Sequence, residues 1–88
     1  MEVSFSSSFK RAFKKRVKGS IDLETKFWGK LEQFILDAYH PSLKTHKLSG
    51  KLKKLWSFSV DYDNRVLFYF MEDEKAVFVD IGSHDEVY

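Results

Sequence analysis

Three histidines carry the chemistry that is most useful near neutral pH, because an imidazole both accepts and donates protons there. They stand at positions 40, 46 and 84. Their spacing lacks the paired ligands of an HExxH site, and no cofactor motif accompanies them, so the sequence predicts neither a metal centre nor a cofactor. His40 precedes a proline, and its place at the end of a predicted helix explains it better than catalysis does. His46 and His84 remain as candidate acid–base residues.

His84 follows Gly82 at the end of a predicted strand, where a rigid scaffold often presents reactive groups, although a surface histidine in a frayed tail is the alternative. Two further side chains, those of Tyr88 and Arg65, fit this chemistry. The ring of Tyr88 suits either packing on the sheet edge or stacking on a base. Arg65 follows an acidic turn, and its guanidinium fits the carboxylates of that turn or a phosphate. Proton transfer and charge stabilisation on a polyanion is the chemistry that these residues support.

The net charge is +2, but the basic residues are concentrated in the first part of the chain. Residues 1–54 carry 13 Lys/Arg against 5 Asp/Glu (+8), and residues 55–88 carry 2 against 8 (−6). Polyanions bind such surfaces through counterion release, although a solvated face is the simpler interpretation. The candidate nucleic-acid contacts are the lysines of two clusters: Lys14 and Lys15, then Lys44, Lys47, Lys51, Lys53 and Lys54.

The length of 88 residues predicts one domain over positions 1–88. There is no cysteine, which excludes disulfides and fits a reducing compartment. Nine Phe, four Tyr and two Trp supply apolar area for a core. No apolar run approaches the roughly 20 residues of a membrane helix, and no signal-peptide pattern begins the sequence. We therefore expect a cytoplasmic globular protein that does not bind membranes.

Two helices are predicted in the first half of the chain. Ser6, Ser7 and Ser8 offer the N-cap of a helix that runs to Lys18, with Phe9, Phe13 and Val17 as its buried stripe. Asp22 is predicted to cap a second helix over residues 23–39, which His40-Pro41 ends. The short turn between the helices predicts a helical hairpin. The predicted apolar face of the second helix consists of Leu23, Phe27, Trp28, Leu31, Phe34, Ile35 and Ala38.

Strands are predicted at residues 1–5, 56–62, 65–71 and 76–81, with turns at 61–64 and 72–74 and a loop over 42–54. Residues 65–71 are apolar on both faces, which indicates a central strand. Gly82 is predicted to end the last strand and to leave residues 83–88 as a tail. The order β-α-α-β-β-β indicates the α+β class, with a helical hairpin packed on an antiparallel sheet.

Four segments of this chain resemble the RelE/ParE superfamily of toxin–antitoxin toxins, and within it the YafQ-like and RelE/StbE-type messenger-RNA interferases. They are Leu43–Gly50, Leu55–Val60, Asp63–Phe68 and Ile81–Tyr88, and the likeness spans essentially the whole chain. The resemblance implies the RelE-like microbial ribonuclease-type fold. It also implies a ribosome-dependent endoribonuclease that enters the A site and cuts messenger RNA. In this chemistry the 2′-hydroxyl attacks the adjacent phosphate without a metal or cofactor.

The resemblance also assigns roles to individual residues. His46, Asp63, His84 and Tyr88 match functional positions of YafQ-like toxins, and Arg65 matches an arginine that RelE places at the head of its central strand. The histidines would share the acid and base steps, with the assignment between them open. Arg65 would stabilise the charge of the transition state, and Tyr88 would stack on a base. The clustered lysines would bind ribosomal RNA.

Two positions depart from the YafQ-like pattern, because Ser59 replaces a histidine and Asp80 replaces an arginine. The family implies an acidic, partly disordered antitoxin as partner, besides the ribosome and messenger RNA. It implies DNA binding only through a complex with that antitoxin. Two alternatives remain: a ParE-like toxin that inhibits DNA gyrase, and an inactive basic module that binds RNA or protein.

Overall fold

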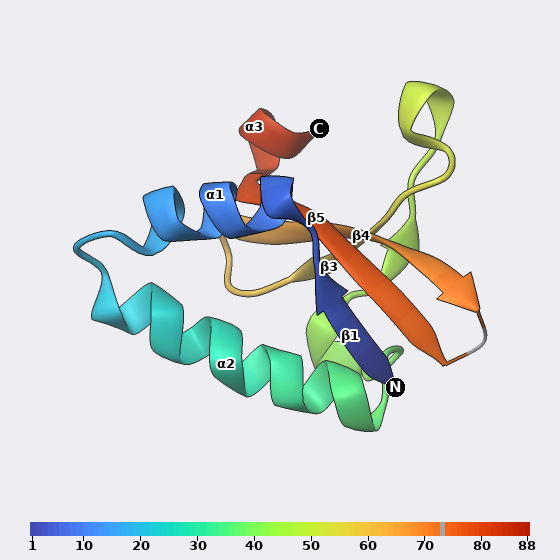
Figure 1. Ribbon diagram of the computed structural model, residues 1–88, viewed down its shortest axis with the longest axis horizontal. Coiled ribbons are helices and arrows are strands. Elements are labelled where there is room, and N and C mark those ends of the chain that lie inside the picture. Colours follow the sequence, from blue (N-terminus) through green and yellow to red (C-terminus); the bar gives the residue numbers. More distant parts are fainter. Residues whose placement is uncertain (73) are drawn as a thin grey trace.

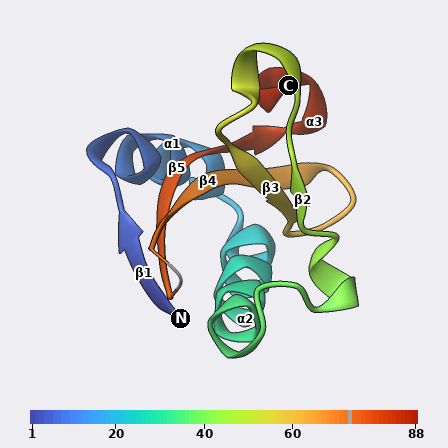
Figure 2. The ribbon, with the colours of Figure 1, turned by 90° about the vertical axis from the view of Figure 1, so that its right-hand side faces the viewer.

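A curved five-stranded sheet packs against two long helices, and a short third helix lies at one end of the molecule (Figures 1 and 2). This computed structural model describes residues 1–72 and 74–88. The element order is β1, α1, α2, β2, β3, β4, β5, α3, with 3-10 turns before and after β2. The predicted α+β class is therefore confirmed. None of the described helices is long and apolar enough to cross a membrane.

Helix α1 (Ser7–Val17) begins where the serines predict it. The hydroxyl of Ser6 caps the helix by accepting a hydrogen bond from the Phe9 main-chain N–H at 3.0 Å. Phe9 is buried, and Phe13 and Val17 pack against the same core. The predicted apolar stripe of this helix is therefore confirmed, and it fixes which side of α1 faces the sheet.

Helix α2 (Ile21–Leu36) differs from the prediction at both ends. Ser20, and not Asp22, is its N-cap residue. The helix stops three residues before Tyr39 because Asp37 takes an extended backbone and its carboxylate accepts a hydrogen bond from the Tyr39 N–H at 3.0 Å. Such a side-chain turn competes with the helical hydrogen-bond pattern. The proline at position 41 is thus not what ends the helix.

The sheet has the strand order β1-β5-β4-β3-β2, so β4 is central as predicted. Strands β2 to β5 form an antiparallel meander. Strand β1 departs from the expected antiparallel arrangement, because it pairs with β5 in parallel. Strands β2 and β4 therefore run opposite to β1, and the three reversals of the meander bring β5 into the direction of β1. The strands are β1 (Glu2–Phe5), β2 (His46–Lys47), β3 (Trp56–Ser59), β4 (Asn64–Glu72) and β5 (Lys75–Ser83).

Three predictions about irregular regions and strand ends are wrong. The segment 42–54, predicted as a loop, contains β2 between the 3-10 turns η1 (Pro41–Leu43) and η2 (Gly50–Leu52). Strand β5 does not stop at Gly82, and the predicted tail forms helix α3 (His84–Val87). Strand β3 also ends at Ser59, before the predicted position 62. The predicted turn at 72–74 includes Asp73, which lies outside the described residues.

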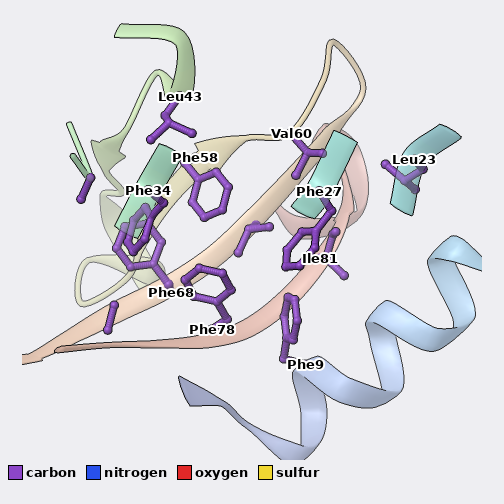
Figure 3. Packing of buried hydrophobic residues seen from close by; sticks show 13 residues of the cluster. Phe9, Leu23, Phe27, Phe34, Leu43, Phe58, Val60, Phe68, Phe78 and Ile81 are labelled. Carbon is purple, nitrogen blue, oxygen red and sulfur yellow. The ribbon is translucent and has the colours of Figure 1, made fainter. Parts of the chain in front are cut away.

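The core consists mainly of phenylalanine rings between the helices and one face of the sheet (Figure 3). The ring centroid of Phe34 on α2 lies 5.1, 5.0 and 5.4 Å from those of Phe58, Phe68 and Phe78 on the sheet. Such contacts add to the large apolar area that each ring buries. Trp28 and Ile35, expected on the buried face of α2, are 44% and 40% exposed, so that face is narrower than predicted.

Candidate active site

The candidate site lies on the sheet face that points away from the core. Side chains alternate along β3, so Phe58 enters the core and Ser57 points to the opposite face. Ser57 is nevertheless 0% exposed. Its hydroxyl makes a hydrogen bond with the phenol hydroxyl of Tyr88, which follows α3. This hydrogen bond between the buried Ser57 and the partly exposed Tyr88 attaches the C-terminal end of α3 to the sheet.

Helix α3 brings His84 and Tyr88 together. The Tyr88 N–H donates to the His84 carbonyl at 3.1 Å, so the two residues are one helical turn apart. Their ring centroids are 4.5 Å apart, with an interplanar angle of 86°. The His84 side chain is 60% exposed, and its Nδ1 lies 3.7 Å from a carboxylate oxygen of Asp85. The imidazole is therefore accessible to a large substrate.

His46 reaches the same place from β2. It is the direct partner of Ser57 in the pairing of β2 with β3, so the two side chains are neighbours on one face. Its ring centroid lies 6.2 Å from that of Tyr88, at an interplanar angle of 68°. Its Nδ1 lies 2.9 Å from the carbonyl oxygen of Lys44. Because a carbonyl only accepts, this contact requires a proton on Nδ1 and leaves Nε2 as an acceptor in the neutral ring.

Arg65 and Asp63 lie at the turn between β3 and β4, and this turn contacts α3. Arg65 Nη1 donates to the carbonyls of Asp61 and Asn64 at 2.6 and 3.2 Å, so the guanidinium bonds the main chain of the turn. Across the strands Arg65 pairs with Gly82, two residues before His84. The carbonyl of Asp63 accepts the His84 N–H at 3.1 Å. Asp63 is thus joined to α3 by its main chain.

The turn itself is held by the carboxylate of Asp61. One of its oxygens accepts from the Asn64 main-chain N–H, the Asn64 side-chain amide and the Asp63 N–H at 2.8, 2.9 and 3.0 Å. Burial opposes ionisation of this group, but these hydrogen bonds and the nearby Lys26 outweigh it and lower the pKa of Asp61. The carboxylate is therefore ionised at neutral pH and fixes the turn that carries Arg65.

The predicted nucleic-acid contacts are exposed. Lys14 and Lys15 lie in the last turn of α1. The lysine loop, which we define as residues 44–54, carries the other five and rises from the same end of the sheet as α3 (Figures 1 and 2). Lys44 adopts a left-handed backbone with φ of 53°, and this turn leads directly into His46. The lysines thus flank the imidazole of His46 along the chain.

The architecture matches solved toxin structures, whereas no family profile and no curated protein matches the chain. A metal-bound toxin from Helicobacter pylori is 23% identical, with 100% of this chain and 99% of that chain covered and a TM-score of 0.78. YafQ in the E. coli DinJ-YafQ complex is 20% identical, with 99% and 97% covered and a TM-score of 0.74. A YoeB/ParE toxin from Agrobacterium tumefaciens is 11% identical, with 96% and 99% covered and a TM-score of 0.77. This chain has the fold of these toxins. The RelE-like fold predicted from the sequence is therefore confirmed.

Ser59 and Asp80, the two departures from the YafQ-like pattern, each make a side-chain hydrogen bond to the main chain. Ser59 donates its hydroxyl to the Asp61 carbonyl at 3.0 Å and so supports the turn next to α3. Asp80 is the β5 partner of Leu67, and its carboxylate accepts the adjacent Ile81 N–H at 2.8 Å. Among the described residues, no group of three or more His, Cys, Asp or Glu side chains is placed to hold a metal ion.

Sequence reasoning missed two parts of the site. The alternation of residues 56–62 predicts Ser57 on the polar face of a half-buried strand, but its side chain is buried beneath Tyr88. Helix α3 was missed although its signal is visible: Ser83 and Glu86 form a capping box, with the serine hydroxyl accepting from Glu86 N and the glutamate accepting from Ser83 N. A helix is what places His84 on the same side as Tyr88.

Proposed function

We propose that this chain is the toxin of a toxin–antitoxin pair and a metal-independent endoribonuclease that cuts messenger RNA on the ribosome. The observation that carries the proposal is the convergence of His46 and His84 on Tyr88, at 6.2 and 4.5 Å between ring centroids. Two imidazoles beside one exposed aromatic ring supply an acid, a base and a stacking surface. RNA cleavage through its own 2′-hydroxyl needs these groups and no external nucleophile.

In the proposed reaction His46 is the base and His84 the acid. Nε2 of His46, left free by the contact of Nδ1 with Lys44, removes the proton of the 2′-hydroxyl. The resulting oxygen attacks the adjacent phosphorus, and the bond from phosphorus to the 5′-oxygen breaks. His84 delivers a proton to that leaving oxygen. The products are a 2′,3′-cyclic phosphate and a 5′-hydroxyl, and each proton transfer contributes roughly 10²–10⁴-fold to the rate.

Charged side chains around the imidazoles complete the proposal. Arg65 uses Nη1 to bond the turn, and in this proposal its other N–H groups stabilise the phosphate that gains charge in the transition state. Tyr88 is 41% exposed, which leaves part of its ring for stacking on a base. The lysine loop, with Lys14 and Lys15, binds ribosomal RNA phosphates by counterion release.

An antitoxin is proposed as the neutralising partner. The E. coli toxin with this fold was solved as the DinJ-YafQ complex. The +8 charge of residues 1–54 suits an acidic partner, because complementary charge speeds association and sets specificity. The single domain would act in the cytoplasm, where the ribosome, the messenger RNA and the antitoxin are all present.

The test is cleavage of a defined message on programmed ribosomes by purified protein. His46→Ala and His84→Ala should each lower the rate by roughly 10²–10⁴-fold. His40→Asn is the matched control, because His40 caps η1 by accepting from the Ser42 N–H and asparagine preserves an acceptor there. That variant should cut at the parental rate.

Other outcomes point to other functions. If folded His84→Ala cuts as fast as the parent, His84 is not the acid and the site is wrongly assigned. If the parent leaves messages intact but inhibits DNA gyrase, the chain is a ParE-like toxin. If it does neither, it is a binding module without this activity.

A further inference from the structure

Arg16 behaves differently from the other basic residues of α1. Lys14 and Lys15 are exposed, whereas the Arg16 side chain is only 29% exposed. Its Nε donates to the Asn64 side-chain oxygen at 2.7 Å, and its Nη1 donates to a carboxylate oxygen of Glu86 at 2.6 Å. The guanidinium therefore connects α1 to the start of β4 and to α3.

Glu86 is also the residue that closes the cap of α3. The same oxygen that binds Arg16 accepts the Ser83 N–H at 3.1 Å, and the Ser83 hydroxyl accepts the Glu86 N–H at 3.2 Å. The Ser83 main-chain and side-chain hydrogen bonds, together with the charge of Arg16, lower the pKa of Glu86. The carboxylate is thus ionised at neutral pH and available to the guanidinium.

Asn64, the second hydrogen-bond partner of Arg16, is also held in place. Asn64 is buried, and its amide nitrogen donates to Asp61 while its oxygen accepts from Arg16. Both ends of the amide are thereby used. The turn that contains Asn64 also accepts the His84 N–H through the Asp63 carbonyl. Arg16 therefore contacts two elements that both bear on the position of His84.

We infer that Arg16 is a positioning residue of the candidate active site: it holds α3 in the orientation that places His84 and Tyr88 next to His46. A four-residue helix is not stable alone and depends on tertiary contacts for its orientation. Two of the five N–H groups of Arg16 are held by short hydrogen bonds to Asn64 and Glu86. We therefore assign Arg16 to the support of α3 and do not group it with Lys14 and Lys15 as a nucleic-acid contact. The catalytic consequence rests on the proposed function.

The ion pair of Arg16 with Glu86 should contribute little to overall stability, because the Glu86 side chain is 61% exposed and exposed ion pairs are weak. Loss of the hydrogen bond to the buried Asn64 oxygen should in contrast lower the melting temperature. The contribution of Arg16 to the position of α3, and so to the position of His84, should be larger. A displacement of reacting groups by about 1 Å can cost roughly 10²-fold in rate. We therefore expect Arg16→Ala to lower kcat by about 10- to 100-fold while KM changes little.

The experiment combines kinetics with a structural measurement that does not require activity. Nuclear Overhauser effects between the ring protons of His46 and Tyr88 report whether α3 is packed against the sheet in this orientation. They should be lost or weakened in Arg16→Ala and partly restored in Arg16→Lys, whose ammonium reaches one of the two acceptors. Arg11→Ala removes the same charge from an exposed position of α1 and should keep both the ring contacts and kcat. Arg16→Ala/Glu86→Gln should be no worse than Arg16→Ala alone.

The inference is overturned if folded Arg16→Ala raises KM for programmed ribosomes while kcat and the ring contacts stay parental, because Arg16 would then be a phosphate contact. It is also overturned if the effects of Arg16→Ala and Glu86→Gln on the ring contacts are additive. If the parent does not cut RNA at all, the proposed function fails, but the ring contacts still decide the role of Arg16. Arg16→Lys serves the same measurement if the alanine variant is poorly folded.

Discussion

Replacing Tyr88 with phenylalanine removes one hydroxyl and keeps the aromatic ring. The hydroxyl of Ser57, in a residue that is 0% exposed, then loses its partner. A buried polar group without a hydrogen bond costs about 1–3 kcal/mol. For a domain of 60 to 100 residues, each kcal/mol lowers the melting temperature by roughly 4–8 °C. We therefore expect Tyr88→Phe to be clearly less stable than the parent.

Removing the other hydroxyl of this pair, that of Ser57, should lower the free energy of unfolding by less. Ser57→Ala removes the buried hydroxyl and leaves that of Tyr88, a residue that is 41% exposed and open to water. The loss is then only the net value of one hydrogen bond, about 0.5–1.5 kcal/mol. Tyr88→Phe/Ser57→Ala should be close to Ser57→Ala alone, because no buried group is left unpaired. The four proteins form a double-mutant cycle that urea unfolding monitored by circular dichroism can measure.

The order of stabilities is what tests the reasoning. If Tyr88→Phe is as stable as the parent, or more stable than Ser57→Ala, Ser57 has another partner and does not fix the phenol. In the cleavage assay both single variants should lower kcat to a similar degree if the hydroxyl only positions the ring. A much larger loss in Tyr88→Phe would instead indicate that the phenol hydroxyl takes part in the chemistry.

Further predictions concern the packing of α3 against the sheet, a glycine of α2 and the charge of the lysine loop. In Gly82→Ala the new Cβ would lie 3.0 Å from a methyl carbon of Val87, so we expect a loss of about 1–3 kcal/mol in urea unfolding. Gly29→Ala, on α2 with open space around the new Cβ, should stabilise by about 1 kcal/mol. The pKa of Glu86 is lowered from 4.5, first by the Ser83 N–H, so its stabilising effect is complete above that pH and is lost as the pH falls through the lower folded value. Proton spectra recorded from pH 7 to 3 should show the His46–Tyr88 ring contacts only above that transition. Neutralising the five lysines of the lysine loop should reduce the salt dependence of ribosome binding in sedimentation.

The sequence predicts the local features of this fold well. The serines before α1, the apolar stripe of Phe9, Phe13 and Val17 and the central position of β4 follow from capping and periodicity. The end of α2 was misplaced because Asp37 competes for a main-chain N–H one turn before the proline. Helix propensity alone does not show which of the two signals, Asp37 or Pro41, ends the helix.

The site is harder to predict because its residues meet through long-range pairing. His46 and Ser57 become neighbours only through the register of β2 with β3, and Tyr88 joins them only because α3 folds back over the sheet. Resemblance to a family located the histidines, but it did not indicate Ser57. The role of Arg16 is also invisible in the sequence, where it is one of six basic residues in a run of nine, from Lys10 to Lys18.

The parallel pairing of β1 with β5 also constrains the order of folding. Glu2 pairs with Lys75 and Phe5 with Phe78, so the partners are 73 positions apart in the chain. Closing so long a loop loses much chain entropy before any contact rewards it, whereas the β3–β4–β5 hairpins close within a few residues. We expect the folding nucleus to form in those hairpins and β1 to dock after the transition state. Substitutions such as Val3→Ala would then accelerate unfolding and leave the folding rate nearly unchanged.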